Sequence, residues 1–271
     1  MVTDEELDKL SKIKVLLKGN SGTGKTFASV KVTDYVASKG FEVLYLDNES
    51  GATKEIRKLG PEAKKNIHYR QFENFQELTE KIAEFKGRSE DIKLMVIDPM
   101  HLVEICRISA KNAFFKEGSY YIGEKKVAIT NKDTFDLRGY MYQVPNSWIF
   151  EFLNGIANAK QDVICTLMTP NKYDVERPYD GKFDYVFETF TEFDNNDKII
   201  FRASPKKLRG AESQDTRAIT NIGNLLISIF KMKYEKKPEG VTEINQKPGE
   251  VKQKPDEVKQ NDNTISTSNA K

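Results

Sequence analysis

One octapeptide sets the class of this protein: Gly19-Asn20-Ser21-Gly22-Thr23-Gly24-Lys25-Thr26 fits the phosphate-binding loop pattern G-x-x-x-x-G-K-[ST] in every constrained position. The apolar run 13–17 before it predicts a buried strand, and residues 26–38 after it predict a helix. This strand–loop–helix context is the one that the pattern requires. It favours nucleotide binding over a simple glycine-rich turn before a helix.

The residue types of this loop suit the binding of phosphate. Small residues let consecutive backbone N–H groups point at phosphate oxygens, and the positive end of the following helix adds roughly half an elementary charge of attraction. We expect Lys25 to reach the β- and γ-phosphates and the Thr26 hydroxyl to complete the coordination of Mg²⁺. The expected nucleotide-binding residues are the whole octapeptide: Gly19, Asn20, Ser21, Gly22, Thr23, Gly24, Lys25 and Thr26.

Composition limits the classes of function. The 271 residues include 43 Lys and Arg against 41 Asp and Glu, so a net charge of +2 gives no global field for nucleic acid. Cys106 and Cys165 lie far apart in apolar surroundings, which suggests buried thiols in a reducing compartment, and His68 and His101 have no ligand-spaced neighbours. No apolar run approaches membrane-spanning length and the N-terminus is charged, so we expect a cytoplasmic protein without a membrane partner.

Strand and helix patterns alternate beyond the loop, which predicts a mainly parallel α/β sheet flanked by helices. The predicted strands cover residues 13–17, 42–46, 67–72, 93–98 and 163–168, and the predicted helices cover residues 26–38, 52–59, 75–85, 148–156 and 221–232. Alternating runs at 185–193 and 199–203 predict an antiparallel hairpin at the edge of the sheet.

The remaining segments set the domain organisation. Residues 1–234 are expected to form one nucleotide-binding domain, which begins with a short helix that a capping box at Thr3 and Glu6 predicts. Residues 106–135 break the alternation and look like an insertion, with a hairpin that turns near Gly123. Residues 235–271 lack aromatic side chains and repeat Lys-Pro-x-Glu-Val-Lys-Gln, which predicts a disordered tail rich in Lys, Pro and Glu.

Two carboxylates stand where predicted strands end. Asp98 ends an apolar strand, where it can hold Mg²⁺ through water near the loop's phosphates, although it could instead cap a turn with Pro99. Glu49 follows the second strand at the edge where ligands of open parallel sheets bind, so it is the candidate to orient and deprotonate a water. The alternative is that Asp47 or Glu49 caps the next helix.

The order of these motifs resembles that of the RecA-like ATPases. It comprises the phosphate loop, a strand ending in Asp-x-Glu at Asp47 and Glu49, a strand ending at Asp98, and a Lys-x-Arg at Lys207 and Arg209. More closely, the chain resembles the compact phage and archaeal members linked to single-strand annealing and recombination. The resemblance covers about residues 12–210, and the phosphate loop is its most specific part.

This resemblance implies that the protein hydrolyses ATP with Mg²⁺ and that Glu49 activates the water. It also implies that Lys207 and Arg209 contact the γ-phosphate of a neighbouring subunit, which would make the active enzyme a homo-oligomer. From the residues alone, the two cations suit a solvated basic turn equally well. Many relatives carry Gln, Asn or His at the end of the fourth core strand, where this chain has Thr166 and Thr169.

The family also contacts single-stranded DNA through loops at this level of the fold. The segment 114–126 interleaves aromatic and basic side chains, as base stacking and phosphate pairing require: Phe114, Phe115, Lys116, Tyr120, Tyr121, Lys125 and Lys126. The resemblance therefore implies a protein that acts on single-stranded DNA in recombination, annealing or repair. The same aromatic residues also suit the core of a hairpin.

Other functions remain open. Residues 171–174, Asn-Lys-Tyr-Asp, match the guanine pattern of GTPases, but Asp98 is followed by Pro99-Met100-His101 where those enzymes need D-x-x-G, so a GTPase is the weaker interpretation. A small-molecule kinase would need an arginine-rich lid, which the sequence lacks. A nucleotide-gated assembly factor resembling a helicase loader would use ATP only to order an interface, and turnover that survives Glu49→Gln would favour it.

Overall fold

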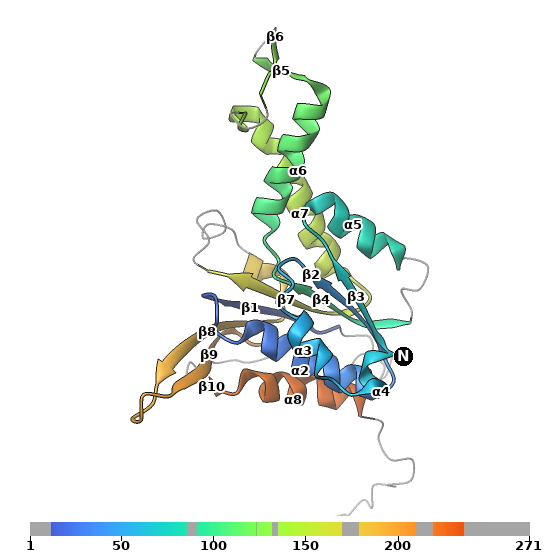
Figure 1. Cartoon of the computed structure of the whole chain (residues 1–271), viewed down its shortest axis with the longest axis vertical. Helices are drawn as coiled ribbons and strands as arrows, with labels where there is room; N and C mark the ends of the chain where they lie inside the picture. Colours follow the sequence, from blue (N-terminus) through green and yellow to red (C-terminus); the bar gives the residue numbers. More distant parts are fainter. Residues whose placement is uncertain are drawn as a thin grey trace, which may run out of the picture. The chain divides into compact units, whose positions relative to one another are not determined.

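The computed structural model describes residues 12–85, 91–122, 124–131, 135–169, 179–209 and 219–235, and an eight-stranded sheet lies at the centre of this part of the chain (Figure 1). The strand order is β10-β9-β8-β1-β7-β4-β2-β3. The strands are β1 Lys14–Gly19, β2 Glu42–Asp47, β3 Ile67–Gln71, β4 Ile92–Asp98, β7 Asp162–Met168, β8 Tyr185–Phe193, β9 Ile199–Lys207 and β10 Ile219–Thr220.

The expected fold class is confirmed, because every pairing from β3 across to β8 is parallel and β9 and β10 add an antiparallel edge. The predicted hairpin is the β8–β9 pair, with Phe193 opposite Ile199. Strand β9 continues to Lys207, so this lysine lies in a strand, and the basic turn considered from the sequence does not begin there. The sequence patterns missed the short β10 and the one-turn helix α4 (Pro61–Lys64).

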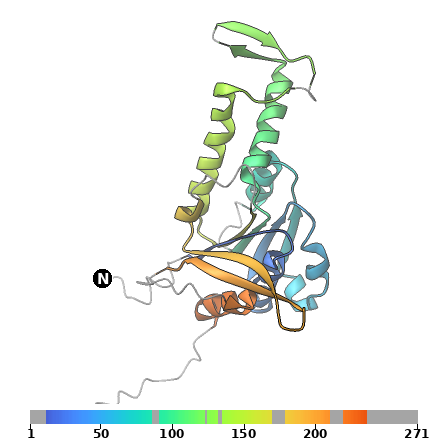
Figure 2. The same ribbon diagram turned by 90° about the vertical axis from the view of Figure 1, so that its left-hand side faces the viewer.

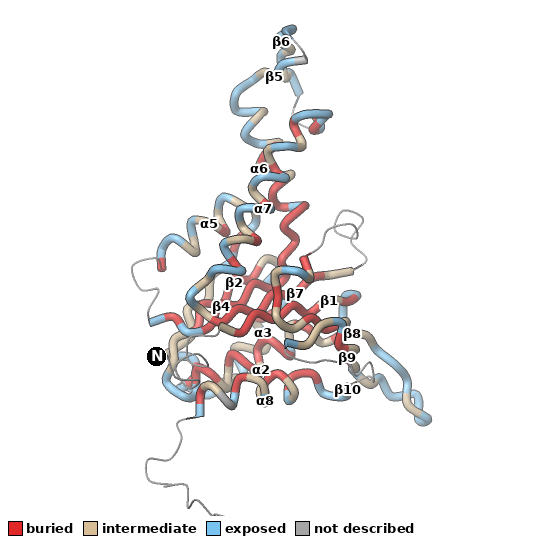
Figure 3. Tube along the Cα trace, turned by 180° about the vertical axis from the view of Figure 1, so that it is seen from behind, coloured by how far each residue is buried: buried red, intermediate tan, exposed pale blue. Residues whose placement is uncertain are grey.

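Helices cover both faces of the sheet, which explains why the central strands contain continuous apolar runs without alternation. One face packs against α2 (Lys25–Ser38) and α8 (Ile222–Tyr234), with the short α3 (Thr53–Arg57) and α4 beside them (Figures 1 and 3). The other face packs against α5 (Phe75–Glu84), α6 (Leu102–Glu117) and α7 (Gln143–Ala157). Successive side chains of β1 divide between the two cores, as the pleat of a strand requires.

The chain between the adjacent strands β4 and β7 forms two long helices that extend away from the sheet. Helices α6 and α7 lie side by side, and the hairpin of β5 (Ser119–Ile122) and β6 (Lys125–Ala128) lies at their far end (Figures 1 and 2). We call the described residues from 102 to 157 the arm. The expected hairpin is therefore present, with Ile122 opposite Lys125. A small core of its own stabilises the arm, formed by Ala110, Phe135, Leu137 and Met141.

Some expectations fall on parts of the chain that the structure does not describe. These are the short helix at Thr3 and Glu6, the guanine-type pattern at 171–174 and the tail beyond residue 235. Both cysteines are buried, as expected. Among the described residues, no helix has both the length and the apolarity to cross a bilayer.

A buried carboxylate at the start of β7 joins three elements. Asp162 Oδ1 accepts from the backbone N–H of Ile13 at 2.9 Å and also from Lys233 Nζ, and its Oδ2 accepts from the Tyr234 hydroxyl at 2.6 Å. Burial and the charge of Asp162 together raise the pKa of Tyr234, which keeps the donating proton on the hydroxyl. Asp162 thus ties the entry to β1 and the end of α8 to the sheet.

We expect Asp162→Asn to lower the free energy of unfolding by about 3 kcal/mol, because it leaves the Lys233 ammonium without its buried counter-charge. Denaturant unfolding measures this change. The control is Lys65→Ala, which removes an exposed pair with Glu62 and should change the same free energy by less than about 0.5 kcal/mol. Equal effects of the two substitutions would contradict a structural role for Asp162.

Candidate functional site

The phosphate loop connects β1 to α2, as the sequence predicts. Gly22 and Gly24 have φ angles of 75° and 85°, in the left-handed region that strains residues with a side chain. Gly24 is the N-cap of α2, and no side chain caps this helix. The first N–H groups of α2 are therefore available to an anionic ligand.

Thr189 of β8 anchors the loop at its start and at Thr23. A Cβ atom on Gly19 would lie 2.2 Å from the Thr189 carbonyl oxygen, so only glycine fits there. The Thr189 hydroxyl donates to Lys18 O at 3.0 Å and lies 2.7 Å from the Thr23 hydroxyl. Sequence reasoning missed Thr189, because its role depends on the pairing of Gly19 with Thr189 between two strands that lie far apart in the chain.

The Lys25 ammonium lies across the loop. Its Nζ donates to the carbonyl oxygens of Gly19 and Asn20, each at 2.7 Å. Burial lowers the pKa of Lys25, while the charges of Asp98 and Glu49 act in the opposite direction. The lysine is thus close enough to both candidate carboxylates to respond to their charge.

Asp98 is buried at the end of β4 and receives hydrogen bonds from three other elements. Its Oδ1 accepts from the hydroxyls of Thr26 at 3.2 Å and Thr166 at 2.5 Å, and its Oδ2 accepts from the Tyr45 hydroxyl at 2.6 Å. Burial is the largest influence and raises the pKa of Asp98, whereas these three hydrogen bonds lower it. The alternative that Asp98 merely caps a turn does not explain this set of donors.

Thr26 and Asp98 are suited to hold Mg²⁺ together with a phosphate. Their side-chain oxygens lie 3.2 Å apart beside the loop, and Mg²⁺ in nucleotide sites takes one or two protein ligands and completes its shell with phosphate and water. The described residues contain no group of three or more His, Cys, Asp or Glu side chains that could hold a metal ion without such a ligand. The residues therefore fit the cofactor that the sequence predicts.

Glu49 lies in a loop that Asp47 organises. Asp47 Oδ1 accepts from the Glu49 backbone N–H at 3.0 Å, and its Oδ2 accepts from the Ala52 N–H at 3.0 Å and the Tyr69 hydroxyl at 2.7 Å. Helix α3 has no N-cap bond from a side chain, so Glu49 does not cap it. Of the two acidic residues considered from the sequence, Asp47 has the structural role and Glu49 has a half-exposed carboxylate.

The register of the sheet brings Glu49 to the phosphate loop. Asp47 pairs with Asp98 across β2 and β4, so the loops that follow these strands are neighbours. Glu49 Oε1 lies 3.2 Å from His101 Nε2 in the second of these loops. The site thus unites Lys25, Thr26, Asp98 and Glu49. Sequence reasoning assigned His101 no role, because it has no ligand-spaced neighbours along the chain.

Lys207 and Arg209 contact parts of the fold other than the phosphate loop. Lys207 Nζ donates to Asp180 O at 3.2 Å, and Arg209 Nη1 donates to Lys12 O at 3.3 Å and lies 3.8 Å from Asp184 Oδ1. Lys207 lies nearer the loop, because the carboxylate of Asp180 binds Lys18 Nζ at 2.8 Å. The Arg209 contacts are at the start of β1, whereas the phosphate loop follows its end. At about 3.3 Å a residue, the strand separates the two places by roughly 16 Å.

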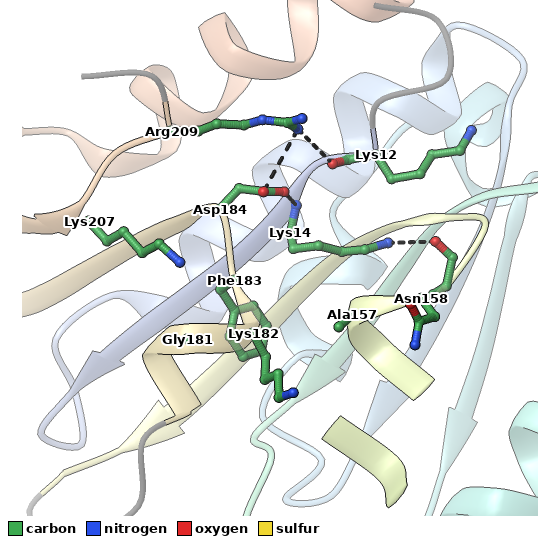
Figure 4. A pocket seen from close by; sticks show the side chains of 11 residues that line it. Lys12, Lys14, Ala157, Asn158, Gly181, Lys182, Phe183, Asp184, Lys207 and Arg209 are labelled. Atoms are coloured by element: carbon green, nitrogen blue, oxygen red, sulfur yellow. Dashed lines mark hydrogen bonds and ion pairs between the residues drawn. The ribbon is translucent and has the colours of Figure 1, made fainter. Parts of the chain in front are cut away.

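The two cations line a pocket of about 420 Å³ (Figure 4). Its lining contains five cationic side chains and one carboxylate: Lys12, Lys14, Lys182, Lys207, Arg209 and Asp184. Lys14 has a structural role, because its Nζ donates to Ala159 O at 2.8 Å. Burial lowers the pKa of Lys14 to about 8. The cationic excess makes this pocket a place for an anionic group.

Comparison with solved structures finds a KaiC-like protein from the hyperthermophilic archaeon Pyrococcus horikoshii OT3, at 16% sequence identity and a TM-score of 0.49. The match covers 77% of this chain and 84% of that chain. No protein-family model matches the chain, and no curated protein matches it. The sheet described above is mainly parallel, with helices on both faces and an antiparallel edge.

We expect Gly19→Ala to lower the free energy of unfolding by more than about 3 kcal/mol, because its methyl group would meet the backbone of Thr189. Gly22→Ala is the matched control in the same loop. It meets nothing within 4 Å and carries only the cost of a left-handed backbone, about 1–2 kcal/mol. Denaturant unfolding of both variants tests the difference, and equal losses would show that contact with Thr189 does not constrain position 19.

Proposed function

We propose that this protein binds ATP with Mg²⁺ and hydrolyses it. The observation that carries the proposal is the convergence of Lys25, Thr26, Asp98 and Glu49 at the uncapped N-terminus of α2. The loop amides and Lys25 would hold the triphosphate, and Thr26 and Asp98 would hold Mg²⁺, which neutralises charge on the phosphate oxygens when bound. Glu49 would orient and deprotonate the attacking water.

Variants of Lys25 and Glu49 separate nucleotide binding from hydrolysis. We expect Lys25→Ala to abolish both, and Glu49→Gln to keep the affinity for ATP while lowering kcat by about 100-fold. Steady-state ATPase rates and titration with a fluorescent ATP analogue measure the two quantities. Unaltered turnover in Glu49→Gln would support the nucleotide-gated assembly factor, and guanine-selective binding would support a GTPase.

We propose single-stranded DNA as the partner, in recombination, annealing or repair, and the far end of the arm as its contact. Phe114 and Tyr120 pack in the arm's core, as the hairpin-core alternative predicted for the aromatic residues. Tyr121, in contrast, is 54% exposed and lies opposite the exposed Lys126 across the β5–β6 pair. An exposed aromatic ring can stack on a base, and an exposed ammonium next to it can pair with a phosphate of the same strand. Phe115, Lys116 and Lys125 are also exposed.

Substitutions at the tip of the arm test this contact. We expect Lys125→Ala with Lys126→Ala to reduce the slope of log K against log salt by about 1.4, because two phosphate contacts are lost from a single strand. Fluorescence anisotropy of a labelled oligothymidine at several salt concentrations measures the slope. The control is Lys64→Ala with Lys65→Ala at the end of α4, which should leave the slope unchanged. An unchanged slope in the arm variant would contradict the proposed contact.

We propose that the active enzyme is a homo-oligomer in which Lys207 and Arg209 reach the γ-phosphate of a neighbouring subunit. Arg209 contacts Lys12 O at the start of β1, roughly 16 Å along that strand from the phosphate loop of its own chain, and this separation supports a role at another chain's nucleotide. The Arg209 side chain is half exposed, in a pocket with an excess of cations. Charge from such a residue stabilises the charge that develops during phosphoryl transfer.

Mixing two inactive variants tests this arrangement. We expect Lys25→Ala and Arg209→Ala each to lack ATPase activity, since one removes the loop's charge and the other removes the contact across the interface. In a mixture, an intact loop of one variant meets an intact Arg209 of the other, so part of the activity returns. The ATPase rate of the mixture, against each variant alone, measures this recovery. No recovery would contradict a contact between subunits.

A further inference from the structure

We infer that His101 is the positioning residue for Glu49, an inference that rests on the proposed hydrolysis of ATP. His101 Nε2 lies 3.2 Å from Glu49 Oε1, although 52 residues separate the two in the chain. The loops that carry them are also joined by their backbones, because the Asn48 N–H donates to Asp98 O at 3.0 Å. The pairing of β2 with β4 therefore fixes the two loops relative to each other and keeps the two side chains in contact.

The two partners differ in how firmly the protein holds them. The His101 side chain is 6% exposed, whereas the Glu49 side chain is 54% exposed. His101 is the N-cap of α6, and its carbonyl oxygen accepts from the Ile105 N–H at 3.0 Å. The imidazole is thus the fixed partner, and the carboxylate, with its rotatable stem, is the one that gains order from the contact.

The surroundings of the imidazole select one tautomer. Nδ1 of His101 is buried and has no hydrogen-bond partner among the described residues. A buried N–H without an acceptor loses its hydration with no compensation, so the proton belongs on Nε2. In this tautomer Nε2–H donates to Glu49 Oε1, and Oε2 is the oxygen left to accept a proton from water.

This arrangement predicts an effect on turnover that is separate from nucleotide binding. A general base must lie within hydrogen-bond reach of the water that it deprotonates, so losing its anchor lowers the fraction of molecules with a correctly placed carboxylate. The hydrogen bonds of Lys25 and Thr26 among the described residues do not involve His101. We therefore expect kcat to fall and KM for ATP to stay constant.

Two amide substitutions give a matched test in the full-length protein. The side-chain amide nitrogen introduced by His101→Gln would take the place of Nε2, whereas the shorter amide of His101→Asn would take the place of the unpartnered Nδ1. We expect kcat of His101→Gln to stay within about threefold of the unaltered protein, and kcat of His101→Asn and His101→Ala to fall about tenfold, with KM for ATP unchanged within about twofold. Thermal melting establishes that each variant is folded.

The Glu49→Gln background completes the experiment. If His101 acts through Glu49, then His101→Asn causes no further loss of turnover once Glu49 is replaced. Equal rates for the Gln and Asn variants, or an equal loss by His101→Asn in both backgrounds, would overturn the inference. If the unaltered protein hydrolyses no ATP, or if Glu49→Gln keeps full turnover, the proposed function fails and the inference fails with it. If Glu49→Gln loses turnover while every His101 variant keeps it, the inference alone fails.

Discussion

The carboxylate of Asp98 is the charge around which the candidate site is assembled. Three hydroxyls, from Thr26 on α2, Tyr45 on β2 and Thr166 on β7, donate to its two oxygens, so the carboxylate links three elements at one end of the sheet. Burial nevertheless raises the pKa of Asp98, which means that these hydrogen bonds offset only part of the cost of burying the charge. A bound divalent cation would supply the missing compensation.

Local patterns in the sequence predicted most of the fold. The phosphate loop, the apolar strands and the β8–β9 hairpin all depend on residues close together in the chain, and the structure contains each of them. The contacts of Thr189 with Gly19 and of His101 with Glu49 were missed, because they arise from the register between distant strands. A sequence shows which strands exist, but a shift of register by one residue would turn both contacts away from the site.

The separation of Arg209 from the phosphate loop of its own chain constrains how copies could assemble. A loop on one chain and Lys207 and Arg209 on the next would meet through two different surfaces, so the proposed interface would be heterologous. Such interfaces repeat head to tail and produce closed rings or helical filaments, never an isolated two-fold dimer. The proposed oligomer would therefore be polar along its axis, with every nucleotide between two chains.

One helix of the arm begins beside the candidate site. Helix α6 begins after His101, which contacts Glu49, whereas α7 leads into β7 at Asp162, the end of that strand away from Asp98. The 16 residues of α6 span about 24 Å at about 1.5 Å a residue. A force on the tip of the arm would therefore be transmitted through α6 to His101, and Glu49 is the carboxylate whose position it would change.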